Sequence, residues 1–217
     1  MKENWLRSTI RLRKGWSKVE TAIPKKKMMQ PTLVIFSGLP GTGKSALADG
    51  LARELRWPLL RIDDIAGDIP PGADYRFWDE MILVLLTLVE TQLELGISVI
   101  ADSVFMGKDR IHAQEIAFKN KALFRPIYCF VSDENVWERR VTERVEEFQH
   151  PDVANWERIQ HQRQWFVPWQ ENTALFVDAV NPAEQNFADV LRFVKDPSFI
   201  CQPLKVDAPL VKGQYHK

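Results

Sequence analysis

The feature that most constrains the fold of this chain is a glycine-rich turn at residues 38–45. The turn reads Gly-Leu-Pro-Gly-Thr-Gly-Lys-Ser and fits the pattern G-x-x-x-x-G-K-[ST]. An apolar, β-rich run, Thr32–Ser37, precedes it, and a helical pattern of apolar residues follows from Lys44 to about Arg56. Because a chance glycine-rich turn would not be expected to carry both flanking elements, the context favours a P-loop.

The P-loop pattern predicts a binding site for a nucleoside triphosphate. Glycines let the backbone turn tightly, so that successive N–H groups and the positive end of the following helix point at phosphate oxygens. Lys44 is expected to reach the β- and γ-phosphates, and the Ser45 hydroxyl is expected to coordinate Mg²⁺. The predicted nucleotide-binding residues are Gly38, Gly41, Thr42, Gly43, Lys44 and Ser45.

The size and composition of the chain favour one α/β domain. Its 217 residues suffice for one full core and are few for two. Cys129 and Cys201, the two cysteines, have neither metal-ligand spacing nor the pattern of a disulfide framework, so a cytoplasmic protein is expected. No apolar run is long enough to span a membrane.

Charge is unevenly distributed, because residues 1–27 carry nine Lys or Arg against two Glu, a net charge of +7, in a chain with no net charge. Within this basic N-terminal extension, Trp5, Thr9, Leu12 and Trp16 recur at helical spacing. Three interpretations stay open. The extension docks on the body through its tryptophans, or it contacts nucleic acid or lipid, or it is a targeting segment.

From residue 31 onward, predicted strands and helices alternate. Strands are expected at 32–37, 58–62, 97–101, 124–131 and 174–178. Helices are expected at 44–56, 75–95, 108–120, 133–148, 153–166 and 183–194, with a loop at 67–74 and a surface tail after 196. In the helix at 75–95, Met81, Leu85, Leu88 and Leu95 are expected on the buried side. This alternation predicts an α/β fold with a mainly parallel, five-stranded sheet covered on both faces.

Carboxylates follow two of the predicted strands. Ligands of parallel sheets bind outside the carboxyl ends of the strands, which selects Asp63, Asp64 and Asp102. One of the first two is a candidate general base for an acceptor hydroxyl, and the alternative is a helix-capping carboxylate. Asp102 is placed like a Walker-B carboxylate that holds Mg²⁺. The alternative interpretation is that Asp102 caps the turn into the next helix. Asp178, after the last strand, is interpreted as structural.

Two further groups of side chains have both a functional and a structural interpretation. Arg140 and Arg144 share one helix face and could close over a transferring phosphoryl group, whereas surface pairs such as Arg139 with Glu143 are the alternative. Aromatic residues could form a stacking wall for a base, but core packing is favoured for them. These aromatic residues are Trp156, Trp165, Phe166 and Trp169.

Together these motifs resemble the P-loop kinases typified by polynucleotide 5′-hydroxyl kinase, with zeta-toxin-like and chloramphenicol phosphotransferase-like enzymes as similar groups. The resemblance covers about residues 31–194 and rests on the P-loop, Arg61–Asp64, Val99–Ser103 with Arg110, and Arg140-x-x-x-Arg144. It implies an AAA-type ATP-binding domain of the P-loop NTPase superfamily, which is a three-layer αβα sandwich. The implied organisation is a basic extension at 1–30, a kinase-like domain at 31–196 with a small helical lid at about 138–155, and a C-terminal tail at 197–217.

The resemblance also implies an activity, the transfer of the γ-phosphoryl group of ATP to a hydroxyl with Mg²⁺ as cofactor. Asp63 matches the family's base, and Arg140 and Arg144 match lid arginines that contact ATP phosphates. Asp64, Asp102 and Arg110 match positions near the acceptor.

Residues 65–67 and 104 depart from the polynucleotide kinases, so a small hydroxylated molecule is at least as plausible an acceptor as a nucleic-acid end. The alternative from another class is an ATP-binding or ATPase switch without an acceptor. Against a switch GTPase, the chain lacks an N-K-x-D motif.

Overall fold

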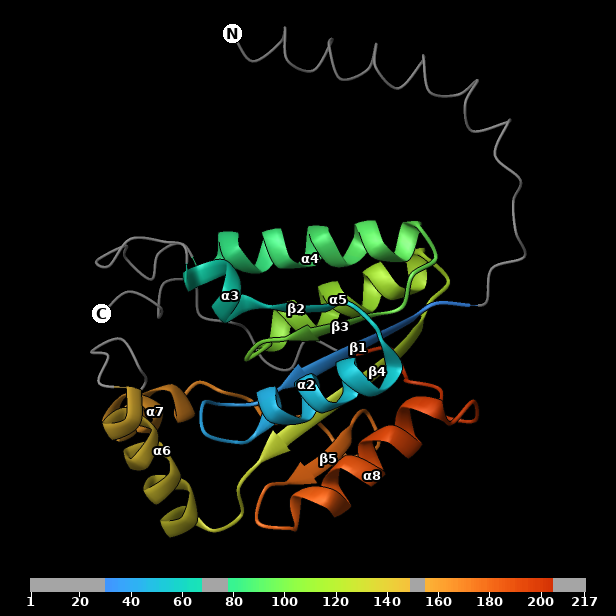
Figure 1. Ribbon diagram of the computed structural model, residues 1–217. Helices are drawn as coiled ribbons and strands as arrows, with labels where there is room; N and C mark the ends of the chain where they lie inside the picture. The colour runs from blue at the N-terminus through green and yellow to red at the C-terminus, as the bar shows by residue number, and fades with distance from the viewer. Residues whose placement is uncertain (1–29, 68–77, 149–154, 205–217) are drawn as a thin grey trace, which may run out of the picture.

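A five-stranded, entirely parallel sheet forms the centre of the molecule in the computed structural model, which describes residues 30–67, 78–148 and 155–204. The strand order is β2-β3-β1-β4-β5 (Figure 1). The strands are β1 (Thr32–Ser37), β2 (Leu59–Arg61), β3 (Val99–Asp102), β4 (Leu123–Phe130) and β5 (Leu175–Asp178). Every residue of β1 is buried, as expected for the central strand of a sheet covered on both faces.

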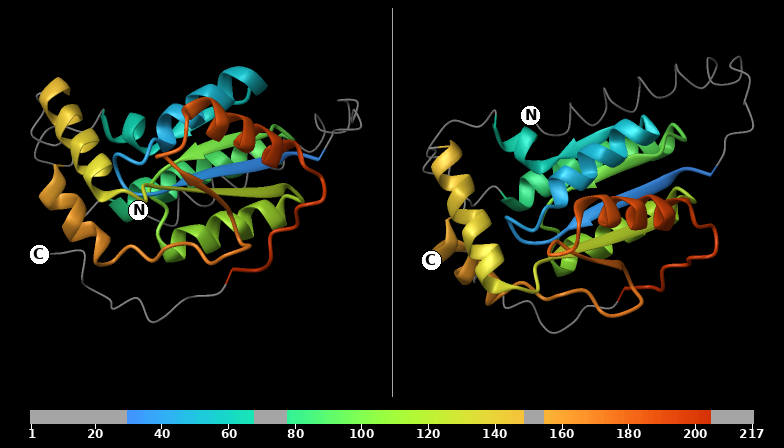
Figure 2. Two further views of the ribbon diagram at one scale, coloured as in Figure 1. Left: turned by 90° about the horizontal axis from the view of Figure 1, so that it is seen from below. Right: turned by 60° about the horizontal axis from the view of Figure 1, so that its bottom comes forward.

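Helices cover both faces of the sheet and one of its ends (Figures 1 and 2). One face carries α4 (Trp78–Glu94) and α5 (Gly107–Lys119), with the short α3 (Ile62–Gly67) beside α4. The other face carries α2 (Lys44–Leu55) and α8 (Ala183–Lys195), which lie side by side. Beyond the carboxyl ends of the strands lie α6 (Glu134–Phe148) and α7 (Trp156–Arg163). The predicted α/β sandwich with a five-stranded sheet is confirmed.

Most predicted elements agree with the structure to within two residues at each described end. Asp133 accepts hydrogen bonds from the backbone N–H groups of Asn135 and Val136, so it caps α6 as its position suggests. The helix predicted at 153–166 is shorter, because α7 ends at Arg163. Residues 75–77 and 153–154, expected as helix, and most of the loop at 67–74 lie outside the described residues; Gly67 ends α3.

The buried side of α4 differs from the expectation. Leu85 is fully buried, but Leu88 is 40% exposed and Leu95 is 60% exposed. The buried face is instead formed by Ile82, Leu85, Leu86, Val89 and Leu93. A helix this rich in leucine offers more than one apolar stripe, and sequence spacing alone does not decide which stripe contacts the sheet.

The segment after α8 also differs from the expected surface tail, because residues 196–204 pack on the body. Arg125, fully buried in β4, donates hydrogen bonds to the carbonyl oxygens of Asp196 (2.7 Å) and Phe199 (3.0 Å). Cys201 is buried, and Gln114 in α5 hydrogen-bonds this segment through its side-chain amide. Residues 205–217 lie outside the described part of the chain. No helix among the described residues is long and apolar enough to cross a membrane.

Candidate active site

The turn between β1 and α2 has the backbone geometry that its glycines permit. Gly41 and Gly43 adopt positive φ angles of 80° and 77°, and Gly38 has φ 146°. A Cβ atom on Gly38 would lie 2.3 Å from the carbonyl oxygen of Cys129 in β4, so no side chain fits there. Burial raises the pKa of the Cys129 thiol to about 12, which makes this cysteine a packing residue beneath the loop.

Hydrogen bonds hold the turn in place from below. The Ser37 hydroxyl donates to the carbonyl oxygen of Val104 (2.8 Å), which ties the end of β1 to the loop after β3. The Thr42 hydroxyl donates to the carbonyl oxygen of Leu39 (2.8 Å), inside the turn itself. Thr42 therefore offers its backbone N–H, rather than its hydroxyl, to a ligand.

The helix that follows begins with the two residues expected to contact phosphate and metal. Lys44, 8% exposed, is the first residue of α2, and the half-buried Ser45 follows it. Gly43 occupies the N-cap position and no side chain caps the helix. The first-turn N–H groups and the positive end of the helix dipole are thus available to an anion.

A buried carboxylate lies next to the P-loop strand. Asp102 ends β3, is 1% exposed, and pairs in register with Phe36 of β1 and Arg61 of β2. Its Oδ2 accepts a hydrogen bond from Arg61 Nε (3.2 Å). Its Oδ1, like the neighbouring Ser103 hydroxyl, is buried and has no hydrogen-bond partner among the described residues.

Arg61 connects three carboxylates at this edge of the sheet. Besides Asp102, it contacts Asp49 of α2 at 3.0 Å and Asp64 at 3.9 Å. Burial alone would lower the pKa of Arg61, but Asp49 and Asp102 more than compensate and raise it. The sequence drew attention to Arg61 only as part of a motif, and its bridging role depends on strand pairing that the sequence does not specify.

Asp63 and Asp64 lie where the sequence placed them, just past β2. Both are exposed in the first turn of α3. Asp64, with a side chain 69% exposed, takes part in the pair with Arg61. Asp63 has no hydrogen bond or ion pair with any described residue, so its carboxylate is available to an external group.

The helix α6 packs directly on the P-loop. Trp137 is 6% exposed and donates a hydrogen bond from Nε1 to the carbonyl oxygen of Pro40 (2.9 Å). A Cβ on Gly41 would lie 2.7 Å from Val141 Cγ2 and 3.1 Å from Trp137 Nε1. In the sequence, Trp137 is one apolar residue within the helix expected at 133–148. No local pattern in the sequence connects it to a loop almost a hundred residues away.

Arg140 and Arg144, the arginines expected to form a lid, lie in different environments. Arg140 is half-buried and near Asp178 at the end of β5. Burial would raise the pKa of Asp178, but hydrogen bonds from Ser132 and Val180 together with the charge of Arg140 lower it. Arg144 is exposed one turn further along α6. Arg139 pairs with Glu143 at 3.8 Å, as the surface-pair alternative predicts.

Arg110 lies inside the protein rather than at an exposed edge of the site. It is 6% exposed, donates from Nε to the carbonyl oxygen of Phe105 (2.8 Å), and lies over the rings of Phe166 and Trp169 at 5.0 and 4.7 Å. The substrate contact expected for Arg110 stays a prediction. Phe166 and Trp169 are buried, and Trp156 packs edge-on against Trp137, so core packing accounts for these aromatics.

The residues present suit a phosphate–magnesium group. The backbone at Gly38 and Gly41 leaves no room for a Cβ atom, Ser45 supplies a hydroxyl, and Asp102 Oδ1 is a buried oxygen with no partner among the described residues. Magnesium prefers few protein ligands together with phosphate oxygens and water. No three His, Cys, Asp or Glu side chains gather into a metal cluster within 30–67, 78–148 and 155–204.

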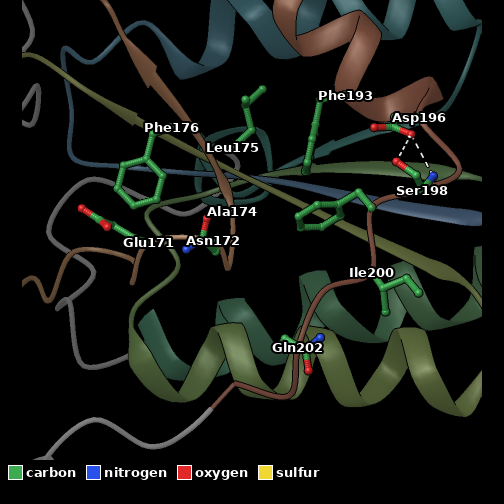
Figure 3. A pocket seen from close by; sticks show the side chains of 11 residues that line it. Glu171, Asn172, Ala174, Leu175, Phe176, Phe193, Asp196, Ser198, Ile200 and Gln202 are labelled. Atoms are coloured by element: carbon green, nitrogen blue, oxygen red, sulfur yellow. Dashed lines mark hydrogen bonds between the residues drawn. The ribbon is translucent and has the colours of Figure 1, made fainter.

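A separate open pocket of about 760 Å³ lies elsewhere, between the start of β5, the end of α8 and the segment 196–202 (Figure 3). Phe176, Phe193 and Ile200 supply apolar surface, and Asp196 and Ser198 hydrogen-bond each other at its rim. None of its lining residues belongs to the P-loop, α3 or α6. The pocket therefore does not belong to the site at the carboxyl ends of the strands.

Comparison with known families agrees with this geometry. Residues 33–169, more than half of the chain, match the model of a family described as an AAA domain. The chain belongs to this AAA domain family. The match contains the P-loop, Asp63, Asp102, α6 and α7, so the AAA domain includes the whole candidate site.

Solved structures share the P-loop NTPase fold of this AAA domain. A protein of Chloroflexus aurantiacus described as a candidate kinase has 23% identity, with 77% of this chain and 100% of that chain covered and a TM-score of 0.62. The APS kinase of Mycobacterium tuberculosis in complex with AMPPNP and APS has 16% identity, with 77% and 99% covered and a TM-score of 0.57. Kti12 of Chaetomium thermophilum in complex with ADP-AlF3 has 14% identity, with 76% and 100% covered and a TM-score of 0.57. No curated protein matches the chain at a significant level.

Proposed function

We propose that this AAA domain is an ATP-dependent kinase that transfers the γ-phosphoryl group of ATP to a hydroxyl of a small molecule or nucleic-acid end. The observation that carries the proposal is the exposed Asp63 carboxylate, without a partner among the described residues, at the same edge of the sheet as the P-loop. A nucleotide switch needs the loop but has no need of a carboxylate base held for an acceptor.

Each residue has a defined task in this mechanism. The loop N–H groups of Gly41, Thr42 and Gly43 and the Lys44 ammonium hold the β- and γ-phosphates. Ser45 and Asp102 would hold Mg²⁺, which would supply neutralising charge for the phosphates. Asp63 accepts the proton of the acceptor hydroxyl, whose oxygen attacks the γ-phosphorus while the bond to the ADP oxygen breaks.

Surrounding residues position these groups. Arg61 holds the Asp102 carboxylate in its orientation and steadies the start of α3 through Asp64. Arg140 and Arg144, on the helix that packs against the loop, supply positive charge to the transferring group. The free, buried Cys129 and Cys201 suit the reducing cytoplasm that we expect for this enzyme.

The test begins with a panel of hydroxylated metabolites and 5′-hydroxyl oligonucleotides incubated with ATP labelled at the γ-phosphate. With a labelled acceptor in hand, Asp63→Asn should lower kcat by about 100-fold or more, the usual contribution of a general base, and leave nucleotide affinity unchanged. Asp64→Asn is the matched control, because it removes the adjacent carboxylate of the same helix turn. We expect it to raise KM for the acceptor more than it lowers kcat.

The results also separate the proposal from the rival function. If Asp63→Asn transfers at the wild-type rate, Asp63 is not the base. If no acceptor takes label while ATP is bound and slowly hydrolysed, the chain is an ATP-binding switch. The fold shared with Kti12, solved with ADP-AlF3, is the observation that keeps this second candidate open.

A further inference from the structure

The outer side of α4 is apolar although it faces away from the sheet. Val84 is 49% exposed, Leu88 is 40% exposed and Leu95, just past the helix, is 60% exposed. Thr91 lies between them, and its hydroxyl donates to the carbonyl oxygen of Thr87, so its polar group is satisfied within the helix. These four residues, Val84, Leu88, Thr91 and Leu95, form what we call the outer stripe.

No described element covers the outer stripe. In Figure 1, α4 is the outermost helix on its face of the sheet, with α5 beside it and the strands beneath it. Leu83, 52% exposed, widens the stripe on one side. An apolar face of this length on an outer helix indicates a partner surface.

The charge of α4 limits the chemistry of that partner. The helix contains four acidic residues and no Lys or Arg. Asp79 pairs with Lys108 and Glu90 pairs with Lys119. Glu80 and Glu94, at the two ends of the outer stripe, have no ion-pair partner within the described residues. A partner should therefore be apolar along its centre and basic around it.

We propose that the basic N-terminal segment of the same chain, residues 5–16, docks on the outer stripe of α4. In the sequence, Trp5, Thr9, Leu12 and Trp16 are separated by four, three and four residues. The residues of the outer stripe, at 84, 88, 91 and 95, are separated by the same intervals. On a helix this spacing forms a seam about 16 Å long, and two seams with equal spacing can pack against each other.

Charge complementarity supports this occupant. Four basic residues lie among the apolar positions of the segment, at 7, 11, 13 and 14, and no acidic residue lies between 5 and 16. They are suited to pair with Glu80 and Glu94, which the described body leaves without ion-pair partners. The segment thus offers both the apolar centre and the basic surroundings that the outer stripe requires.

The described chain begins close to the outer stripe, so residues 5–16 are within reach of it. Thr32 donates its backbone N–H to the Ser98 hydroxyl (3.0 Å), three residues beyond Leu95. The chain therefore enters the body beside the carboxyl end of α4. The 13 residues between Trp16 and Gln30 can span about 45 Å, which exceeds the length of the stripe. Because the segment is tethered, its effective concentration favours it over a second copy of the chain.

Thiol labelling in the full-length protein tests this docking. Leu88→Cys places a thiol in the outer stripe, and the native Cys129 and Cys201 are buried and should react slowly. Replacing Trp5, Leu12 and Trp16 together by serine should speed alkylation at residue 88 by at least fivefold. Thr91→Cys repeats the measurement at a second position of the stripe.

A matched thiol on the opposite face serves as control. Gln185→Cys lies on an exposed position of α8, across the sheet from α4, and the serine substitutions should leave its alkylation rate unchanged. Charge reversal at Glu80 and Glu94 to lysine should also speed alkylation at residue 88 in low salt. An unchanged rate there would contradict the charge part of the proposal.

Two outcomes would overturn the proposal. Alkylation at residues 88 and 91 that is equally fast with and without Trp5, Leu12 and Trp16 would mean that the segment does not cover the stripe. Protection that grows with protein concentration, together with a dimeric mass in solution, would assign the stripe to a second copy of the chain. Protection independent of concentration and lost with the serine substitutions supports docking of the segment.

Discussion

Alanine at Gly41 should destabilise the protein more than alanine at Gly43, although both glycines have nearly the same backbone conformation. Their φ angles are 80° and 77°, so each substitution carries the cost of a left-handed residue, about 1–2 kcal/mol. They differ in what the new methyl group meets. At Gly43 the nearest atom is Ala179 Cβ at 3.8 Å, an ordinary contact, whereas at Gly41 Val141 Cγ2 lies at 2.7 Å.

The extra loss of unfolding free energy for Gly41→Ala, compared with Gly43→Ala, reports how tightly α6 packs on the P-loop. Overpacking against a helix costs about 1–3 kcal/mol, so Gly41→Ala should lower the free energy of unfolding by about 2–5 kcal/mol and Gly43→Ala by about 1–2 kcal/mol. Urea denaturation of the nucleotide-free protein measures both, with midpoints expected to differ by about 0.5–1 M. Val141→Ala removes the clashing methyl group, so the double variant with Gly41→Ala should lose less than the sum of the single losses.

Equal losses at the two glycines would refute the packing of α6 on the loop. Strict additivity of Gly41→Ala and Val141→Ala would refute it as well, because two residues in contact should couple. If the reasoning holds, Gly41→Ala should also weaken nucleotide binding. To relieve the clash the loop must move away from α6, where the hydrogen bond from Trp137 to the Pro40 carbonyl oxygen fixes its present position.

Two further predictions concern buried charges. Arg61→Met should lower the free energy of unfolding by about 3–5 kcal/mol in urea denaturation, because it leaves the buried Asp102 carboxylate without its cation; a loss below about 1 kcal/mol would mean that the pair is not formed. Burial raises the pKa of Asp109 from 3.8 to about 6, against the opposing hydrogen bond from Met106 N–H. The folded state thus binds this proton more tightly than the unfolded state, and the ionised carboxylate destabilises the fold as pH rises from about 4 to above 6. Asp109→Asn should therefore gain up to about 3 kcal/mol over wild type between pH 4 and pH 7 in denaturation experiments, and an equal difference at both pH values would contradict this.

The parts of the fold that could be predicted from the sequence are those determined locally. The six residues of β1 are all apolar or small, without the polar alternation of a half-exposed strand. The loop that follows has a fixed sequence pattern, and this pattern also sets where α2 begins. Gly96, which ends the α4 region, has φ 72° and donates its N–H to Leu93, as expected for a glycine after a helix. Each of these features depends on residues that are close together in the sequence.

The parts that could not be predicted depend on pairings between distant segments. Arg61 contacts Asp102 only because β2 and β3 are neighbours in the sheet. The sequences of the two strands do not predict that they pair. The burial of Arg125 requires the segment at 196–199, which has no periodicity of its own. Leu88 is exposed because a different apolar face of α4 packs against the sheet. In each case the sequence supplied the residue type but not its partner.

Trp137 connects the P-loop to α6, the helix that carries the predicted lid arginines, in a way that the separate motifs do not suggest. Its indole N–H bonds the loop backbone at Pro40, while Arg140, one turn further along the same helix, lies near Asp178 at the end of β5. The arginines that we assign to the transferring phosphoryl group are therefore positioned by the loop that would hold the phosphates. We therefore expect phosphate binding at the loop and the placement of α6 to depend on one packing contact, which requires glycine at position 41.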